Sequence, residues 1–181
     1  MILPVVKIPA KNLFTPSKKV VKFDQKLHRL VRDMKNTLIA AHDPEGVGLA
    51  AVQVGINIRL FIIRPKKREK IKIFINPEIL KIESGTKSKT ENKQKVETKT
   101  TLEGCLSVDK IWSEISRPQK IHLKYQTIDE AMHEEWFEGF EAVIVQHEVD
   151  HLDGILFTRR ALEQNTTLFE EKRGKLHKIE L

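Results

Sequence analysis

The stretch QHEVDH, residues 146–151, combines two histidines and a carboxylate that can hold and use a metal ion. His147 and His151 are four positions apart, which is about 400° of rotation on a helix, so both imidazoles point the same way one turn apart. Glu148 lies about 100° further round, within reach of a metal-bound water without being a ligand. The spacing predicts a helical metal site. Two buried core histidines are the alternative interpretation.

A catalytic zinc-type site takes three protein ligands and keeps one position open, so a third ligand is needed. Glu170 or Glu171, downstream, would complete the ligand set of a zincin-like peptidase. Cys105, in TLEGCLSV, is the other candidate. A thiolate with two neutral imidazoles leaves a divalent ion one net positive charge, which lowers the pKa of a bound water. Since Cys105 is the single cysteine, it has no disulfide partner within the chain, and a small buried hydrophobe is its alternative role.

The segment GVGLAAVQVG, residues 46–55, has two glycines two positions apart that allow close backbone approach. It is not a phosphate-binding loop, because no Lys-Ser or Lys-Thr pair follows it. If the segment lies beside the metal, Gln53 supplies an uncharged donor for a developing oxyanion. A tight turn into a strand is the simpler interpretation.

The composition predicts one soluble domain over residues 1–181. Of the residues, 40% are hydrophobic and 31% charged, and the formal net charge is +7, which favours contact with anionic surfaces. The N-terminal residues do not resemble a signal peptide, because their apolar run is short and interrupted by Pro4 and Lys7. No stretch approaches the roughly 18–20 apolar residues that span a bilayer. We therefore expect a cytoplasmic protein with no membrane partner.

Apolar periodicity predicts two helices. The first covers residues 24–42 with Asp24 as N-cap, and the second covers residues 138–152, carries the histidines and ends at Gly154. Residues 58–65, 71–82 and 120–129 have the composition of strands. Residues 81–101 are expected to form an exposed charged loop. Residues 159–181 are expected to form a charged tail with a weak helical pattern through Ala161, Leu162, Leu168 and Phe169.

These elements predict an α+β fold: short antiparallel sheets packed around a central helix that carries the metal site, with an N-terminal helix and a C-terminal helical tail. Three motifs then occur in a set order. They are GVGLAAVQ at residues 46–53, EGCLS at residues 103–107, and QHEVDH followed by LDG at residues 146–154. In type, order and spacing the chain resembles the peptide deformylase family over most of its length.

The resemblance implies hydrolytic removal of the formyl group from the initiator methionine of nascent polypeptides, with release of formate. It implies one divalent metal ion per chain, Fe²⁺ natively, with Zn²⁺, Ni²⁺ or Co²⁺ as substitutes. The implied partners are the N-formyl-methionyl nascent peptide and, transiently, the ribosome near its exit tunnel.

The resemblance also implies roles for single residues. Cys105, His147 and His151 hold the metal, a metal-bound hydroxide attacks the formyl carbon, and Glu148 acts as general base and acid. The Gln53 side chain and the Leu106 N–H stabilise the oxyanion. Residues that pair with an extended peptide or line the methionine pocket are Val47, Gly48, Gly104, Phe140, Val143 and Ile144, for the last three of which plain core packing is the alternative.

Two further residues are expected to support the ligands. Glu103 and Arg117 should form an ion pair that holds the cysteine segment. Asp150 is expected to orient or cap the helix rather than to bind metal.

The sequence departs from the family pattern away from the ligands. Asp109 stands where proline is usual, Val52 precedes Gln53 in place of Pro or Thr, and the N-terminal segment differs. These departures leave open a deformylase acting on another N-formyl substrate. An inactive metal-binding, ribosome-associated relative is a further alternative.

Overall fold

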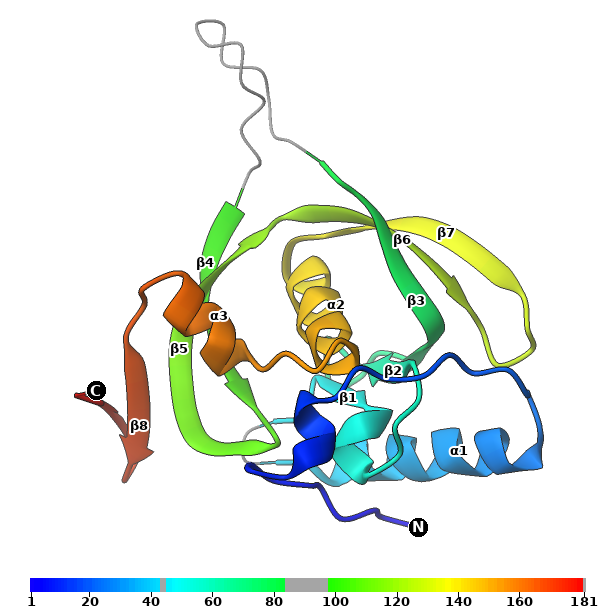
Figure 1. Ribbon diagram of the computed structural model, residues 1–181, viewed down its shortest axis with the longest axis horizontal. Coiled ribbons are helices and arrows are strands. Elements are labelled where there is room, and N and C mark those ends of the chain that lie inside the picture. The colour runs from blue at the N-terminus through cyan, green and yellow to red at the C-terminus, as the bar shows by residue number, and fades with distance from the viewer. Residues whose placement is uncertain (43–44, 84–97, 181) are drawn as a thin grey trace, which may run out of the picture.

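The computed structural model describes residues 1–42, 45–83 and 98–180. Two antiparallel sheets and three α-helices make up the fold, which confirms the expected α+β class. In Figure 1 the helix α2 lies in the middle of the molecule, between strands β4 and β5 on one side and β3, β6 and β7 on the other.

The larger sheet supplies most of the core. Its strand order is β1-β2-β3-β6-β7, and its members are β1 (Gly48–Ala50), β2 (Leu60–Ile63), β3 (Lys72–Ile82), β6 (Lys120–Gln126) and β7 (Met132–Glu138). The predicted strands at 58–65, 71–82 and 120–129 correspond to β2, β3 and β6. β2 is buried at every position, as its continuous apolar run requires, whereas β6 alternates because one face meets solvent.

The smaller sheet carries one metal-binding candidate. Its order is β4-β5-β8-β9, with members β4 (Thr98–Cys105), β5 (Val108–Pro118), β8 (Leu168–Lys172) and β9 (Lys175–Lys178). Cys105 is the last residue of β4 and pairs across a tight turn with Val108. The sheet register therefore fixes the backbone position of Cys105.

Helix α2 (Gly139–Leu152) is buried on nearly all sides. Such a helix must be apolar around its circumference, and the buried polar groups it carries need specific partners. The helix ends where Gly154 adopts a left-handed backbone with φ of 72°. A Cβ atom there would lie 2.8 Å from the carbonyl carbon of Phe14, so glycine is needed both for conformation and for space.

Helix α1 (Gln25–Ala40) begins at the predicted N-cap. The Asp24 side chain accepts hydrogen bonds from the N–H groups of Lys26 and Leu27. The apolar stripe of α1 packs against the larger sheet through Leu27, Val31, Met34 and Leu38. Two 3-10 helices, η1 (Lys11–Phe14) and η2 (Ala51–Val54), and the short helix α3 (Phe157–Glu163) complete the helices.

The exposed loop expected over residues 81–101 is wrong at both of its ends. Lys81 and Ile82 belong to β3, and residues 98–101 belong to β4, because their backbones pair with β6 and β5. The side chains of these residues are mostly exposed and polar, and this composition suggested a loop. Backbone pairing makes the same residues the ends of strands. Residues 84–97 lie outside the described part of the chain.

The C-terminal tail begins as helix α3 and continues as strands. Leu168 and Phe169, which continued the helical pattern in the sequence, lie in β8 instead. The hairpin β8–β9, here called the C-terminal hairpin, extends the smaller sheet beyond β5. Leu168 packs against the cluster that contains Phe157 and Ala161 of α3, and Phe169 pairs with Trp112 of β5.

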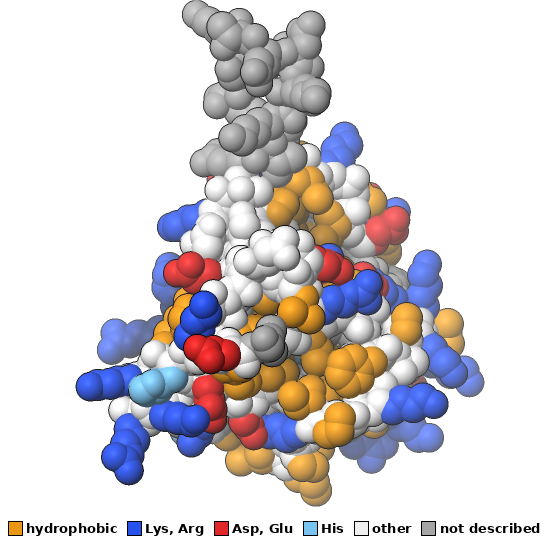
Figure 2. Space-filling view, turned by 60° about the vertical axis from the view of Figure 1, so that its left-hand side comes forward, with side chains coloured by type: hydrophobic (Ala, Val, Ile, Leu, Met, Phe, Trp, Pro, Cys, Tyr) orange, Lys and Arg blue, Asp and Glu red, His pale blue; other side chains and the backbone are white. Residues whose placement is uncertain are grey.

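No helix within the described ranges is long and apolar enough to cross a membrane. One face of the molecule shows Lys and Arg side chains around its outline and hydrophobic side chains gathered toward its lower part (Figure 2).

Candidate metal centre and active site

Cys105, His147 and His151 form one cluster, here called the metal cluster. One ligand atom from each lies within 4.8 Å of the others. Cys105 comes from the end of β4, and both histidines come from successive turns of α2. The Sγ atom of Cys105 is 3.1 Å from Nε2 of His151. Among the described residues, neither Glu170 nor Glu171 belongs to such a cluster.

His147 is oriented by a carboxylate behind it. Its Nδ1 atom lies 2.9 Å from Oε2 of Glu103, the residue two positions before Cys105. Because the carboxylate accepts a hydrogen bond, Nδ1 carries the proton and Nε2 is left with its lone pair. Glu103 in turn accepts two hydrogen bonds from Arg117, at 2.6 and 3.0 Å. The expected pairing of Glu103 with Arg117 is thus present, and it is buried.

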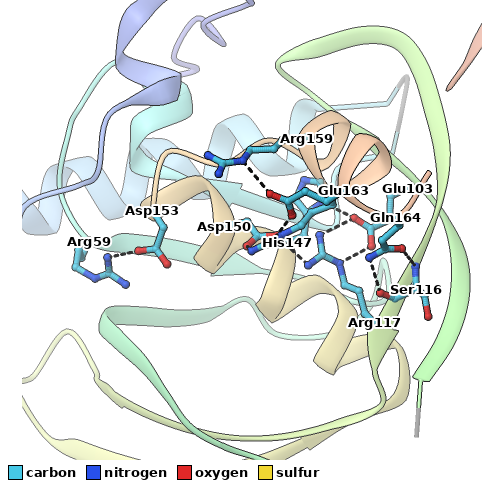
Figure 3. A network of polar contacts seen from close by, with 11 residues as sticks. Arg59, Glu103, Ser116, Arg117, His147, Asp150, Asp153, Arg159, Glu163 and Gln164 are labelled. Atoms are coloured by element: carbon cyan, nitrogen blue, oxygen red, sulfur yellow. Dashed lines mark hydrogen bonds and ion pairs between the residues drawn. The ribbon is translucent and has the colours of Figure 1, made fainter. Parts of the chain in front are cut away.

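The ion pairs continue beyond the metal cluster to α3 (Figure 3). Arg117 donates to Asp150 of α2 at 2.9 Å. Asp150 also accepts two hydrogen bonds from Arg160, at 3.1 and 2.6 Å. The Asp150 carboxylate therefore bridges two arginines rather than capping α2. This arrangement links β4, β5, α2 and α3 through charged groups that compensate one another.

The cluster favours a thiolate. Burial alone would raise the pKa of Cys105, but the neighbouring His151 and His147 hold it well below its ordinary value. Burial would lower the pKa of His147, but Cys105 and Glu103 raise it well above its ordinary value. In the absence of a cation the negative sulfur thus favours a second proton on His147. A bound metal ion can take the place of that proton.

Glu148 lies on the side of α2 that faces β1. A Cβ atom at Gly48 would lie 2.2 Å from Oε1 of Glu148, so only glycine at position 48 leaves room for the carboxylate. The residue is 3% exposed. Burial raises the pKa of its side chain to about 7. A carboxyl group with this pKa can accept and return a proton near neutrality.

Gln53 is held with its amide nitrogen toward Cys105. Its Oε1 atom accepts a hydrogen bond from the Ala50 N–H at 2.8 Å, which fixes the orientation of the amide. Its Nε2 atom lies 3.4 Å from Sγ of Cys105 and 3.3 Å from Oγ of Ser107. The close backbone turn at residues 46–53 therefore delivers an oriented donor to the metal cluster.

A cavity of about 290 Å³ opens beside the metal cluster and is here called the central cavity. Its lining includes every residue for which the sequence predicted substrate binding: Val47, Gly48, Gly104, Phe140, Val143 and Ile144. Gln53, Cys105, Leu106, His147 and Glu148 line the same cavity. Phe140 is 54% exposed at this position, whereas Val143 and Ile144 are almost fully buried.

Some lining residues had no predicted role: Glu45, Gly46, Thr101, Leu102 and Trp112. Leu102 and Trp112 enter the cavity because β4 and β5 pair in a particular register, with Glu103 opposite Ser113. Alternation within β5 assigns Trp112 and Ser113 to opposite faces, but only the pairing with β4 shows which face meets the cavity.

The residues of the cluster fit a divalent transition metal. One sulfur and two imidazole nitrogens are donors that such ions prefer. Oε2 of Glu148 is buried and has no hydrogen-bond partner among the described residues. A buried acceptor beside three ligands is what a metal-coordinated water would require.

Comparison with known proteins shows which family the chain resembles. Residues 2–167 match the family model described as Polypeptide deformylase. A peptide deformylase of Novosphingobium aromaticivorans is 34% identical, with 96% of each chain covered. One from Helicobacter pylori strain Shi470 is 35% identical, with 98% of this chain and 95% of the relative covered.

Solved structures show the same architecture. The peptide deformylase of Thermotoga maritima superposes with a TM-score of 0.76 at 36% identity, covering 88% of this chain and 97% of that one. The class I type b enzyme of Acinetobacter baumannii, solved with Met-Ala-Ser bound, gives a TM-score of 0.75 at 35% identity, covering 88% and 98%. The chain therefore belongs to the polypeptide deformylase family.

Proposed function

We propose that this protein removes the N-formyl group from the initiator formylmethionine of nascent polypeptides and releases formate. The observation that carries the proposal is the placement of Cys105, His147, His151 and Glu148 beside one cavity, in a chain of the deformylase family. The A. baumannii relative, which binds Met-Ala-Ser, supports a peptide with N-terminal methionine as the occupant of that cavity.

In this account Cys105, His147 and His151 hold one divalent ion. When bound, the ion would act as a Lewis acid and lower the pKa of a coordinated water. Ferrous iron is our first choice, with zinc, nickel or cobalt as substitutes, because a donor set of one thiolate and two imidazoles suits each of them. Glu103 keeps Nε2 of His147 available, and Arg117 keeps Glu103 ionised.

Glu148 moves the proton. With its pKa raised to about 7, the carboxylate can take a proton from the attacking water and deliver it to the leaving amine nitrogen. Gln53 donates from Nε2 to the oxyanion that forms on the formyl oxygen, and the Leu106 N–H is its second donor. The fixed Gln53 amide needs no reorientation during the reaction.

The substrate would lie along β4 as an extended strand. Val47, Gly48 and Gly104 line the cavity, and their backbone groups would hydrogen bond with the substrate, as in strand addition. Val143, Ile144 and Phe140 offer an apolar wall for the methionine side chain. Since α2 carries both this wall and the histidines, the side chain and the formyl group are positioned by one rigid element.

The working location that we propose is the cytoplasm, near the ribosomal exit tunnel. The net charge of +7 supports contact with an anionic surface. Co-sedimentation with ribosomes at low salt, lost as salt is raised, would support this contact. Equal recovery of the protein without ribosomes would contradict it.

The experiment that tests the function is anaerobic formate release from formyl-Met-Ala-Ser. Protein loaded with ferrous iron or nickel should turn the peptide over, and chelator-treated protein should not. Acetyl-Met-Ala-Ser is the matched control, because it differs by one methyl group at the reacting carbon. Release of formate only from other N-formyl amines would mean a different substrate, and none from any would mean an inactive relative.

A further inference from the structure

Trp112 is a large side chain at the central cavity for which the reaction described above has no use. It lies in β5, diagonally across from the end of β4, and its ring packs on Gly104. A Cβ atom at Gly104 would lie 2.7 Å from Cζ3 of Trp112, so the absence of a side chain at position 104 lets the indole approach the β4 backbone.

Residues of the C-terminal hairpin contact the indole of Trp112. Its Nε1 donates a hydrogen bond of 2.8 Å to Oε2 of Glu171 in β8. Phe169, two residues earlier in β8, pairs directly with Trp112 across the sheet. A side chain packed on one side and hydrogen bonded at its tip has few accessible rotamers. The C-terminal hairpin therefore fixes the position of the indole.

Trp112 also lines two hollows. It lines the central cavity, and it lines a second, smaller hollow of about 120 Å³ together with Glu171, Ile111 and Lys110. Leu102 and Phe140, 48% and 54% exposed, are large apolar side chains that line the central cavity and are also open to solvent. Apolar side chains from β4, β5 and α2, namely Leu102, Trp112 and Phe140, therefore line the central cavity together.

We propose that Trp112 is a specificity-determining residue for the residues that follow methionine in the substrate, and that Glu171 is its positioning residue. This inference rests on the proposed function. An extended peptide whose first residue lies at the metal cluster must pass Gly104, and Trp112 covers Gly104. The indole face offers contact to a large apolar or aromatic side chain just after the methionine.

The energetic expectation is modest. A stacked or edge-on aromatic pair contributes enough for roughly a 3- to 10-fold change in kcat/KM. Because the contact is the same in the ground state and the transition state, the change should fall on KM rather than kcat.

The test compares formyl-Met-Ala-Ser with formyl-Met-Phe-Ser and formyl-Met-Ala-Phe on the metal-loaded full chain. The wild type should favour at least one phenylalanine peptide over formyl-Met-Ala-Ser. Trp112→Ala should remove that preference through KM, and Glu171→Leu should reduce it. Glu171→Gln should restore it, since the amide oxygen can still accept from the indole. Trp136→Leu, a matched change at the 42% exposed tryptophan of β7, should leave the preference for the phenylalanine peptide unchanged.

A second measurement does not depend on turnover. In Trp136→Phe, Trp112 is the single remaining tryptophan. Titration with the product peptide Met-Phe-Ser or Met-Ala-Phe should then shift its fluorescence emission, and Glu171→Leu in the same background should weaken the apparent affinity.

The outcomes separate the two proposals. Absence of turnover of all three peptides by the metal-loaded wild type would overturn the proposed function. Turnover without a phenylalanine preference, or a preference unchanged in Trp112→Ala, would overturn the role of Trp112 and leave the function intact. A phenylalanine preference that survives Glu171→Leu would overturn the positioning role of Glu171.

Discussion

His147 can present Nε2 to a metal because Glu103 occupies its other ring nitrogen. The same carboxylate is held near a pKa of about 2, since hydrogen bonds from His147 and Arg117 outweigh the effect of its burial. Glu148, without such partners, has its pKa raised to about 7 by burial. The two buried glutamates thus differ in pKa because their neighbours differ. The lowered pKa suits Glu103 to orienting His147, and the raised pKa suits Glu148 to proton transfer.

Replacement of Cys105 by serine should remove the metal. A neutral hydroxyl is a poor ligand for a transition metal, so metal content should fall from about one ion per chain to near zero. Elemental analysis after gel filtration measures this. Glu170→Gln, which alters the ligand expected of a zincin-like peptidase, should retain the metal. Loss of metal in Glu170→Gln with retention in Cys105→Ser would contradict the assignment.

Single residues differ in how far the sequence could predict them. The four-residue spacing of His147 and His151 needs only a helix, so it predicts their proximity without knowledge of the fold. The choice of Cys105 over Glu170 or Glu171 came from the resemblance, because the spacing left both open. Trp112 could not be found, since its place in the cavity depends on the pairing of β4 with β5 and on Glu171, 59 positions away.

At the scale of elements, charged side chains hold α2 against its neighbours. Arg117 of β5 is 5% exposed and contacts Glu103 of β4 and Asp150 of α2. A buried charge that loses its partner is costly, so both carboxylates depend on this guanidinium.

Arg117→Met should therefore lower the free energy of unfolding by about 3–5 kcal/mol. Urea denaturation of the metal-free protein measures the change. Arg159→Met is the matched control, because Arg159 pairs with Glu163 at the surface, with 65% and 43% of the two side chains exposed. Its effect should stay within about 0.5 kcal/mol. Equal effects of the two variants would argue against a structural role for the buried pair.

Helix α1 should depend on pH through Asp24. Hydrogen bonds from the helix N–H groups, that of Leu27 foremost, hold the pKa of Asp24 below its ordinary value. A lowered pKa means that the cap stabilises fully above the ordinary value and loses its effect as pH falls through the folded-state value. The difference in thermal midpoint between wild type and Asp24→Ala should therefore shrink below about pH 4.

Asp24→Asn supplies the control for this prediction. Asparagine caps a helix without titrating in this range, so the difference between Asp24→Asn and Asp24→Ala should not vary with pH. A gap between wild type and Asp24→Ala that stays constant down to strongly acidic pH would contradict the capping role.

Elements with a strong local pattern could be predicted, and those defined by pairing could not. The helix expected over 24–42 is α1 and that over 138–152 is α2, because each has an apolar period and a clear end signal. The first four residues of β4, Thr98 to Thr101, were expected in a loop, since they contain no large apolar residue. The spacing of Leu168 and Phe169 suggested a helix, but both residues lie in β8, whose backbone pairs with β5.

At the scale of the molecule, both sheets contribute to one site around α2. The larger sheet brings Gly48 and, through η2, Gln53, while the smaller sheet brings Glu103 to Cys105. We infer a single domain, because Glu148 and the histidines of α2 face elements of both sheets. The C-terminal hairpin extends the smaller sheet beyond β5 (Figure 1). Under our proposal a change in this hairpin would act on substrate choice rather than on the metal.

The measurement that tests the central claim most directly is formate release from formyl-Met-Ala-Ser by metal-loaded wild type and Glu148→Ala. The variant should keep about one metal ion per chain and lose roughly 10²- to 10⁴-fold in kcat, because the ligands are intact and the proton acceptor is gone. Wild-type turnover that Glu148→Ala retains with full metal content would contradict the account. It would place the proton transfer on another group and remove the reason for a buried carboxylate whose Oε2 has no hydrogen-bond partner among the described residues.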